Sequence, residues 1–437
     1  SIPVISPVTE KVIGEAPGAS ESDTMQAIES AVLGTEKWRK VGAWERSKLL
    51  KKSAEIMRDK TEEMAHWLTM ELGKPLDQSA GEIGMAIEQF EWYAEETKRI
   101  NGKIMESRQP NAKVMIQHEP VGVVAALTSW NFPVVLAARK IAPAVAAGCS
   151  VILRPAEEAP GSAMSFIQCL HEVGFPSGVI NLINGYPENV SPVLMNDTRV
   201  RKISLTGSTR VGKLLLKASA ETLKRTSMEL GGHAPVIVYD DADAEAVALQ
   251  AAVVKFKHCG QVCASPSRFF IHEKSVHAFA NKFIEVTKNF KLGNGMDKGV
   301  DIGPLATEKR REEVEKMVSG TLESGARLRL GGKRPEVFER GFFFEPTVFD
   351  RVPDHAPIMM EEPFGPLVPI TTFKNFSEVI ERANSIEYGL TSYIFTSSQR
   401  LAHDTADALE AGMVAVNTFA LASAETPYGG VKQSGFG

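Results

Sequence analysis

The chain has few cysteines and lacks the features that most often mark secreted, membrane-bound or zinc-binding proteins. Its four cysteines in 437 residues do not resemble a disulfide framework, and the opening SIPVISPVTE lacks the regions of a signal peptide. No run approaches the ~18 uncharged apolar residues of a membrane span. The histidines show no zinc-binding spacing. We therefore expect a cytoplasmic protein with neither a metal nor a membrane partner.

The chain also lacks the excess of positive charge that is typical of nucleic-acid-binding proteins. Its formal net charge is −5 at pH 7, which gives no general attraction to phosphate backbones. The hydrophobic share of 43% is ordinary for a globular protein, and 437 residues exceed what one core usually supports. We expect at least two domains and no nucleic-acid partner.

The order of the predicted elements indicates an α/β fold. Residues 21–100 show helical periodicity, and residues 101–120 predict a protruding strand hairpin. From residue 121, apolar strand-like runs alternate with helical segments, which is typical of a doubly wound parallel sheet of Rossmann type. A second α/β stretch begins near residue 233. We predict a cofactor-binding domain (1–100 and 121–232), an oligomerisation hairpin (101–120), a catalytic domain (233–428) and a return segment (429–437).

Two side chains have the chemistry of a nucleophile and of a base. Cys263 in GQVC is flanked by small and polar residues, and a thiol is strongly nucleophilic once its surroundings favour the thiolate. Glu229 in MELGG has apolar neighbours, and desolvation raises the pKa of a carboxyl toward neutrality. Taken singly, each has an ordinary alternative: a buried structural cysteine and a carboxylate in a salt bridge.

Two further segments suit ligand binding. LTGSTRVG places Gly207, Ser208 and Gly212 at the start of a predicted helix, which suits a pyrophosphate, although the G-x-G-x-x-G fingerprint is missing. Asn131 in TSWNFP follows a predicted strand, at the edge where open α/β sheets bind ligands. A capped helix and a turn with core aromatics are the structural alternatives for these two segments.

Six motifs occur together in one order: WNFP at 130–133, RPAEE at 154–158, LTGSTRVG at 205–212, MELGG at 228–232, GQVC at 260–263 and EEPFGP at 361–366. Their order and spacing, with 34 residues between Glu229 and Cys263, resemble the aldehyde dehydrogenase superfamily over essentially the whole chain. The pattern is most similar to succinate-semialdehyde and 2-oxoglutarate-semialdehyde dehydrogenases. The resemblance implies the family's fold: a Rossmann-like cofactor domain, an α/β catalytic domain and a small oligomerisation hairpin.

The resemblance also implies the activity, the NAD(P)-dependent oxidation of an aldehyde through a cysteine thiohemiacetal and a thioester. Cys263 is similar to the family's nucleophile, Glu229 to the base that hydrolyses the thioester, and Asn131 to the side-chain donor of the oxyanion hole. Lys140 resembles the lysine near the cofactor. The implied cofactor-binding residues are Thr128, Trp130, Arg154, Glu157, Gly207, Ser208, Gly212, Leu230, Glu362 and Phe364.

The choice between NAD and NADP depends on Arg154 and Glu157. A carboxylate at Glu157 accepts hydrogen bonds from free ribose hydroxyls and repels a 2′-phosphate, which favours NAD. Arg154 is a cation nearby that offsets this repulsion, so NADP stays an alternative. Glu229 argues for hydrolysis of the thioester, since family members that pass the acyl group to coenzyme A characteristically lack that glutamate.

Three positions resemble the substrate-carboxylate contacts of succinate-semialdehyde dehydrogenases: Arg139, Lys257 and Ser423. Lys257 stands where those enzymes carry arginine, so a point charge replaces a bidentate fork. These residues imply succinate semialdehyde as the substrate, with 2-oxoglutarate or glutarate semialdehyde and a broad specificity as alternatives. Without the resemblance, Arg139 and Lys257 read as solvated or ion-paired helix residues. Ser265 stands where some relatives carry a second cysteine, so we expect no disulfide switch there.

The ends of the chain and the predicted hairpin bear on assembly. Relatives usually have an earlier strand and continue beyond SGFG, so we expect the C-terminal oligomerisation strand to be missing. The hairpin still predicts a homodimer or homotetramer, because an unpaired edge favours a partner.

Two other functional classes are alternatives to a dehydrogenase. One is a cysteine hydrolase, which needs no nucleotide, and the other is an inactive dehydrogenase scaffold, which needs no reactive thiol. Tryptophan fluorescence with NAD and thiol labelling distinguish them from a dehydrogenase.

Overall fold

Two mainly parallel sheets organise the chain, and the computed structural model describes all residues from 1 to 437. The first sheet has six strands in the order β19-β9-β8-β5-β6-β7, and every neighbouring pair except β19 and β9 runs parallel. Its strands are β5 (Val123–Leu127), β6 (Ser150–Arg154), β7 (Ile180–Leu182), β8 (Val200–Thr206), β9 (Arg225–Glu229) and β19 (Gly435–Phe436). The chain order reverses at β5, which confirms the predicted doubly wound sheet.

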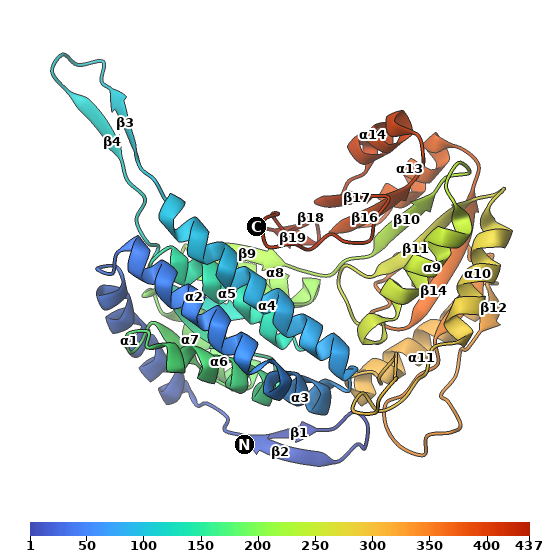
Figure 1. Cartoon of the computed structure of the whole chain (residues 1–437), viewed down its shortest axis with the longest axis horizontal. Coiled ribbons are helices and arrows are strands. Elements are labelled where there is room, and N and C mark those ends of the chain that lie inside the picture. The colour runs from blue at the N-terminus through green and yellow to red at the C-terminus, as the bar shows by residue number, and fades with distance from the viewer.

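Helices cover both faces of the first sheet because its central strand is apolar on both sides (Figure 1). Val124 and Ala126 of β5 pack against one helical layer, and Val123 and Ala125 pack against the other. One layer contains α2 (Ala43–Asp59), α3 (Thr61–Leu72), α4 (Leu76–Glu96), η1 (Thr97–Arg99), α5 (Pro133–Ala146) and α6 (Pro160–Val173). The other contains α1 (Glu21–Trp38), α7 (Pro187–Asn196) and α8 (Thr209–Ala220).

The second sheet has seven strands in the order β12-β13-β14-β11-β10-β16-β17, and only β12 is antiparallel to its neighbour. Its strands are β10 (Ala234–Val238), β11 (Pro266–His272), β12 (Arg327–Leu330), β13 (Thr347–Asp350), β14 (Leu367–Phe373), β16 (Thr391–Phe395) and β17 (Met413–Val416). The accompanying helices are α9 (Ala244–Lys255), η2 (Lys257–Gly260), α10 (Val276–Lys288), α11 (Glu308–Glu323), α12 (Pro357–Met360), α13 (Phe376–Asn384) and α14 (Gln399–Ala408).

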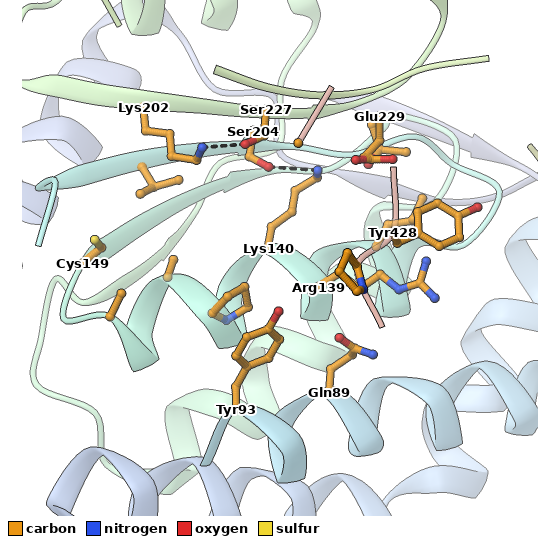
Figure 2. Close-up of a pocket in the computed structure, with 18 of the residues that line it drawn as sticks. Gln89, Tyr93, Arg139, Lys140, Cys149, Lys202, Ser204, Ser227, Glu229 and Tyr428 are labelled. Atoms are coloured by element: carbon orange, nitrogen blue, oxygen red, sulfur yellow. Dashed lines mark hydrogen bonds between the residues drawn. The ribbon is translucent and has the colours of Figure 1, made fainter. Parts of the chain in front are cut away.

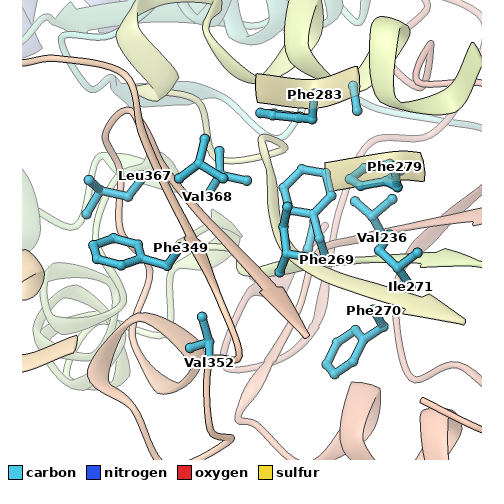
Figure 3. Packing of buried hydrophobic residues seen from close by; sticks show 14 of the residues in the cluster. Val236, Phe269, Phe270, Ile271, Phe279, Phe283, Phe349, Val352, Leu367 and Val368 are labelled. Atoms are coloured by element: carbon cyan, nitrogen blue, oxygen red, sulfur yellow. The ribbon is translucent and has the colours of Figure 1, made fainter. Parts of the chain in front are cut away.

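Aromatic side chains fill the core around β11 (Figure 3). Phe269 packs on Phe279 and Phe283 of α10, with ring centroids 5.9 and 5.7 Å apart. Phe270, the next residue along the strand, is buried as well and points away from these rings. Because β11 is buried on both faces, it gives a rigid base to the loop that precedes it.

Three two-stranded sheets lie outside the two main ones: β1 (Ile2–Ile5) with β2 (Val12–Ala16), β15 (Tyr388–Gly389) with β18 (Val431–Lys432), and β3 (Lys103–Glu106) with β4 (Lys113–Ile116). The β3–β4 hairpin protrudes from the body of the protein (Figure 1). Its strand residues are all exposed, including Ile104 at 67% and Met115 at 63%. The hairpin has the exposed apolar character expected of an assembly surface, while the dimer or tetramer stays a prediction. None of the helices combines the length and apolar character that crossing a membrane requires.

A buried carboxylate caps α6 from a distant helix. Glu71 near the end of α3 is 2% exposed, and its two oxygens accept hydrogen bonds from the backbone N–H groups of Gly161 and Ser162, both at 2.7 Å. The Ser162 hydroxyl donates to the same carboxylate at 2.5 Å. Since the first N–H groups of a helix have no partner within it, this contact joins α3 to α6 by satisfying them.

We expect Glu71→Ala to lower the free energy of unfolding by about 2–4 kcal/mol, because it leaves buried donors at the start of α6 without an acceptor. Urea unfolding followed by circular dichroism measures the change. Glu63→Ala is the matched control, since Glu63 lies exposed on the same helix and its loss should change stability by no more than ~0.5 kcal/mol. Equal stability of the two variants would contradict a capping role for Glu71.

Candidate active site

Cys263 lies in a sharply turned loop between η2 and β11. His258, Cys259 and Gly260 before it all have left-handed backbone conformations, with φ of 47°, 55° and 75°. A Cβ at Gly260 would lie 2.2 Å from the carbonyl oxygen of Gly365, so no side chain fits there. Such conformations are rare for residues with side chains and persist only where surrounding contacts hold them.

The MELGG motif allows this loop to approach the end of β9. A Cβ at Gly232 would lie 2.5 Å from the carbonyl oxygen of Cys263, and one at Gly231 would lie 2.8 Å from Glu362 Oε2. Glycine at both positions therefore permits close contact between the two halves of the site. As a result Glu229, the last residue of β9, and Cys263 line one cavity.

Two cavities meet at Cys263. The larger, of about 520 Å³, extends past Arg139, Lys140, Glu229 and Tyr428, and the smaller, of about 210 Å³, extends past Trp130, Ser208, Glu362 and Phe364. Thr206, Leu230 and Cys263 line both. A thiol at such a junction is accessible to one ligand from each side.

The thiol of Cys263 has a phenol beside it. Its Sγ lies 3.3 Å from Oη of Tyr428. Burial raises the pKa of Cys263, and the hydrogen bond from Tyr428 opposes that rise. Burial also raises the pKa of Tyr428 well above its usual range, so the phenol keeps its proton and is able to donate it to a thiolate. Tyr428 is thus placed to donate a hydrogen bond to a thiolate at Cys263.

Glu229 and Lys140 form a pair of ionisable groups in the larger cavity (Figure 2). Burial raises the pKa of Glu229 to about 7, and Lys140 and Arg139 oppose the rise. Burial lowers the pKa of Lys140 to about 7, while Glu229 acts in the opposite direction. Glu229 Oε2 is buried without a hydrogen-bond partner, whereas Lys140 Nζ donates to Ser204 Oγ at 3.1 Å. Near neutrality Glu229 is therefore poised to exchange a proton.

Asn131 and the backbone of Cys263 offer two hydrogen-bond donors. The Asn131 side chain is fixed at both ends: Oδ1 accepts from Ser129 Oγ at 2.8 Å, and Nδ2 donates to the carbonyl oxygen of Gln261 at 3.0 Å. An amide nitrogen has two protons, so one remains for a ligand. The N–H of Cys263 donates to no oxygen of the chain. Both donors are available to an oxyanion formed next to the thiol.

The smaller cavity contains several of the predicted cofactor residues. Glu362 Oε1 accepts the N–H of Gly232 at 3.1 Å, and burial raises the pKa of its carboxyl to about 7. Phe364 packs edge-on against Trp130, with ring centroids 5.6 Å apart. Gly207 and Ser208 line the cavity, and Ser208 caps α8 by accepting the Val211 N–H.

Of the other predicted cofactor residues, Leu230 lines this cavity, whereas Thr128, Arg154, Glu157 and Gly212 do not. A Cβ at Gly212 would lie 2.6 Å from Leu230, so glycine allows α8 to pack on that side chain. Thr128, directly after β5, is 4% exposed and its hydroxyl has no partner. Arg154 is already engaged: its guanidinium donates to the Gly185 carbonyl at 2.8 and 3.0 Å and pairs with Glu157 at 2.6 Å.

The structure brings two of the three predicted substrate residues to the larger cavity. Arg139 and Ser423 line it, and the Arg139 guanidinium lies 4.6 Å from the ring centroid of Tyr428 without an ion pair or hydrogen bond. Lys257 is exposed and lines neither cavity. The chain turns at His258 immediately after Lys257, so the lysine stays outside the turn that carries Cys263 inward. The geometry gives no support to Lys257 as a substrate contact.

Several residues at the site escaped the sequence analysis. Tyr428 stands in the glycine-rich segment TPYGGVKQSGFG, five residues after the predicted substrate residue Ser423. Its nearness to Ser423 is the one feature of the sequence that could have pointed to it. Gln89 and Tyr93 reach the cavity from α4, and Arg310 reaches the smaller cavity from α11. These three lie on amphipathic helices, where a buried or cavity-facing polar residue has no distinctive pattern.

Comparison with known proteins agrees with this geometry. The model of the aldehyde dehydrogenase family matches residues 1–437. A glutarate-semialdehyde dehydrogenase from Pseudomonas putida is 39% identical over 437 residues, covering 100% of this chain and 90% of that protein. An NADP(+) succinate-semialdehyde dehydrogenase from Escherichia coli is 38% identical with the same coverage. A crystal structure titled as an E. coli NADP-dependent enzyme has a TM-score of 0.98 at 38% identity, covering 100% of this chain and 90% of that one.

We expect Tyr428→Phe to slow alkylation of Cys263 by iodoacetamide about threefold to tenfold at pH 7.5, because the thiolate loses one hydrogen bond. Mass spectrometry of the labelled chain measures the rate, and Cys263→Ser identifies the reacting thiol. Tyr93→Phe removes a hydroxyl from the same cavity that does not contact the thiol, and should leave the rate unchanged. An equal rate for Tyr428→Phe and the unsubstituted protein would contradict the role assigned to the phenol.

Proposed function

Because the chain belongs to the aldehyde dehydrogenase family, whose members oxidise aldehydes with NAD(P), we propose that its substrate is an aldehyde bearing a carboxylate and that it converts succinate semialdehyde to succinate. The observation that carries this proposal is the unpaired Arg139 guanidinium in the cavity that ends at Cys263. A cation without an internal partner, fixed by stacking on a tyrosine ring, suits an anionic group of the substrate.

Ser423 adds a hydroxyl to the same cavity. The succinate-semialdehyde and glutarate-semialdehyde dehydrogenases similar to this chain are both named for aldehydes with a terminal carboxylate, which supports the same class of substrate here. Glutarate semialdehyde, one carbon longer, is the second candidate, because a cavity of about 520 Å³ has room for either molecule.

The first chemical step uses Cys263 and its two neighbouring donors. The Sγ attacks the aldehyde carbon, and the carbonyl oxygen becomes an alkoxide that accepts hydrogen bonds from Asn131 Nδ2 and from the Cys263 N–H. Donors placed where negative charge develops lower the barrier by roughly 3–4 kcal/mol each. Tyr428 stabilises the thiolate before the attack, and Arg139 holds the far end of the substrate.

The smaller cavity fits the nicotinamide end of the cofactor. The Thr128 hydroxyl is buried without a partner, the Ser208 N–H at the start of α8 donates to no oxygen of the chain, and Gly231 leaves room beside Glu362. We assign Glu362 to a ribose hydroxyl, Phe364 and Trp130 to the nicotinamide wall, and Ser208 to the pyrophosphate. A bound nicotinamide supplies the acceptor for the hydride that leaves the tetrahedral carbon.

NAD is the cofactor we favour, because Glu157 places a carboxylate where a 2′-phosphate would be repelled. The ion pair of Glu157 with the buried Arg154 reduces that repulsion, so NADP is the alternative cofactor. Since Arg154 is committed to Gly185 and Glu157, we assign it to positioning this loop and only Glu157 to a direct contact with the ribose.

Hydrolysis of the thioester requires a base, and Glu229 is the group placed to serve as one. Glu229 lines the cavity that contains Cys263 and its Oε2 has no hydrogen-bond partner, so the carboxylate is able to hold a water molecule and to accept a proton from it. The cysteine leaves as a thiolate that Tyr428 stabilises. Lys140, with its pKa lowered to about 7, is a suitable group to exchange that proton onward with Ser204.

The unsubstituted enzyme should prefer succinate semialdehyde over butanal by roughly 100-fold in kcat/KM, and Arg139→Met should lower the value for the semialdehyde about 10- to 100-fold, because one charge-assisted contact is lost. Methionine keeps the unbranched apolar stem of the side chain and removes the charge, so butanal should be affected no more than about threefold. The formation of reduced nicotinamide, followed by its absorbance, gives both rates.

Lys257→Met is the matched control for Arg139→Met, since it removes a cation that lies outside both cavities. It should leave both substrates unaffected. An equal loss for butanal and succinate semialdehyde in Arg139→Met would count against a carboxylate contact, while leaving the aldehyde dehydrogenase reaction in place.

The turnover rate should depend on the protonation of Glu229. A carboxyl whose pKa is raised to about 7 becomes a base only as the pH rises through that value, so kcat should increase with pH around an apparent pKa of about 7. Glu229→Gln should keep a first burst of reduced nicotinamide and lower the steady-state rate by about 100-fold or more, because only the hydrolysis is lost.

Glu158→Gln is the control for this pH profile, because burial raises the pKa of Glu158 to about 7 as well and its side chain lines neither cavity. The inflection should persist in that variant. A profile that keeps its inflection in Glu229→Gln would exclude Glu229 as the titrating base.

A further inference from the structure

Polar residues in the turn before α4 and in the first two turns of that helix contact both halves of the active site. Lys74 and Glu82 face the segment of the first sheet that carries Asn131, and Gln78 faces the loop of the second sheet that carries Cys263. None of the three lines either cavity. We refer to Lys74, Gln78 and Glu82 as the α4 cluster.

The first half of the contact is a buried ion pair. Lys74 Nζ lies 2.5 Å from Glu82 Oε2, and both side chains are completely buried. The same Nζ donates to the backbone carbonyl of Asn131 at 3.0 Å and lies 4.2 Å from the ring centroid of Phe132. Lys74 therefore fixes the backbone of Asn131, whose side-chain amide is the proposed donor.

Glu82 extends this contact to α5. Its Oε1 accepts the N–H groups of Val134 and Val135 at 2.9 and 3.2 Å, and so caps the helix that begins two residues after Asn131. Removing one partner of a buried ion pair leaves the other uncompensated, so the two charges depend on each other. Asn131 is thereby held from both sides: its carbonyl by Lys74, and the helix that follows it by Glu82.

The second half of the contact belongs to Gln78. Its Oε1 accepts the N–H of His258 at 2.9 Å, and its Nε2 donates to the carbonyl of Asp301 at 2.9 Å. His258 begins the left-handed stretch that leads to Gln261 and Cys263. The Leu76 N–H also donates to the carbonyl of Gly295, at 3.1 Å. The start of α4 thus anchors the strained loop of the nucleophile to the layer that carries Asn131.

We propose that the α4 cluster positions the two oxyanion donors relative to each other, and that Lys74, Gln78 and Glu82 are positioning residues for the acylation of Cys263. This inference rests on the proposed roles of Asn131 and Cys263. The two donors come from different sheets, and the cluster is a direct polar connection between the segments that carry them. A displacement of either donor weakens stabilisation of the alkoxide and leaves the thiol itself unaltered.

Two reactions of the same thiol test the proposal without a nucleotide. In acylation by p-nitrophenyl acetate, the Sγ–carbon bond forms, p-nitrophenolate leaves, the thiol proton passes to solvent, and the tetrahedral step needs the oxyanion donors. Alkylation by iodoacetamide displaces iodide at a saturated carbon and needs no such donors. Lys74→Met should slow acylation about 10- to 100-fold and change alkylation less than about twofold.

Gln78→Met is a second variant, and it leaves no buried charge without a partner. It should slow acylation about threefold to tenfold and leave alkylation unchanged. Lys60→Met is the control for removing a lysine from an ion pair: it breaks the partly exposed pair of Lys60 with Glu172, 2.5 Å apart, neither of which lines either cavity, and it should change neither reaction. Selective loss of acylation in Lys74→Met and Gln78→Met supports the proposal.

Equal slowing of both reactions in Lys74→Met and Gln78→Met would overturn the proposal in favour of a general structural role, and unchanged acylation in both would overturn it directly. Asn131→Ala separates this from the proposed function. If Asn131→Ala slows acylation and the two cluster variants do not, the cluster has no positioning role. If Asn131→Ala itself has no effect, or the unsubstituted protein forms no acyl-enzyme, the proposed function fails and the role of the cluster fails with it.

Discussion

The hydrogen bond from Asn131 Nδ2 to the carbonyl oxygen of Gln261 is the contact on which the arrangement of the site depends. It is 3.0 Å long, both residues are buried, and Asn131 follows β5 of the first sheet whereas Gln261 precedes β11 of the second. This contact uses one of the two protons on Asn131 Nδ2 and so fixes the direction of the other. The same hydrogen bond therefore joins the two sheets and orients a donor beside the Cys263 thiol. Gln261 is held in turn, since its side chain donates to the His258 carbonyl and accepts the Ala306 N–H. The position of the hydrogen-bond donors beside the thiol therefore depends on how the two sheets meet.

The cost of this arrangement appears in ionisable groups of the larger cavity that lack a partner. The half-buried Glu229 has an oxygen without a hydrogen-bond partner, and the half-buried Arg139 has no ion pair. A structural core would not retain such groups, because desolvation of a polar group without a partner opposes folding. Lys74 and Glu82 are buried too, but each satisfies the other and several backbone groups besides. The contrast separates unpartnered side chains that line the cavity from fully partnered side chains that support the framework.

Much of this organisation could be predicted from sequence patterns. The alternation of apolar runs with helical segments from residue 121 predicts the doubly wound sheet, and the spacing of six motifs predicts that Glu229 and Cys263 meet. Those motifs are local, and each has a chemical reason: glycine where Gly232 meets Cys263, and small residues around Ser208 where a helix begins. The family and the fold are confirmed by the comparisons, while the roles of the individual residues stay predictions.

The residues that escaped prediction act through contacts between distant segments. Tyr428 reaches the thiol from 165 positions further along the chain, and Lys74 reaches Asn131 from 57 positions before it. Neither has a local pattern that distinguishes it from a surface tyrosine or lysine. Lys257 illustrates the opposite difficulty. Its spacing from Cys263 resembles that of a substrate residue, yet the left-handed turn at His258 leaves its side chain outside both cavities.

The segment between β17 and β19 has a further consequence for how the two sheets are joined at the larger cavity. It leaves the second sheet after Val416, passes Ser423 and Tyr428, and returns to the first sheet where Gly435 pairs with Glu229. One wall of the larger cavity is thus a covalent strap whose two ends are both fixed by strand pairing. Because the strap pairs with a strand of each sheet, any shift of one sheet against the other would displace the wall that carries Ser423 and Tyr428.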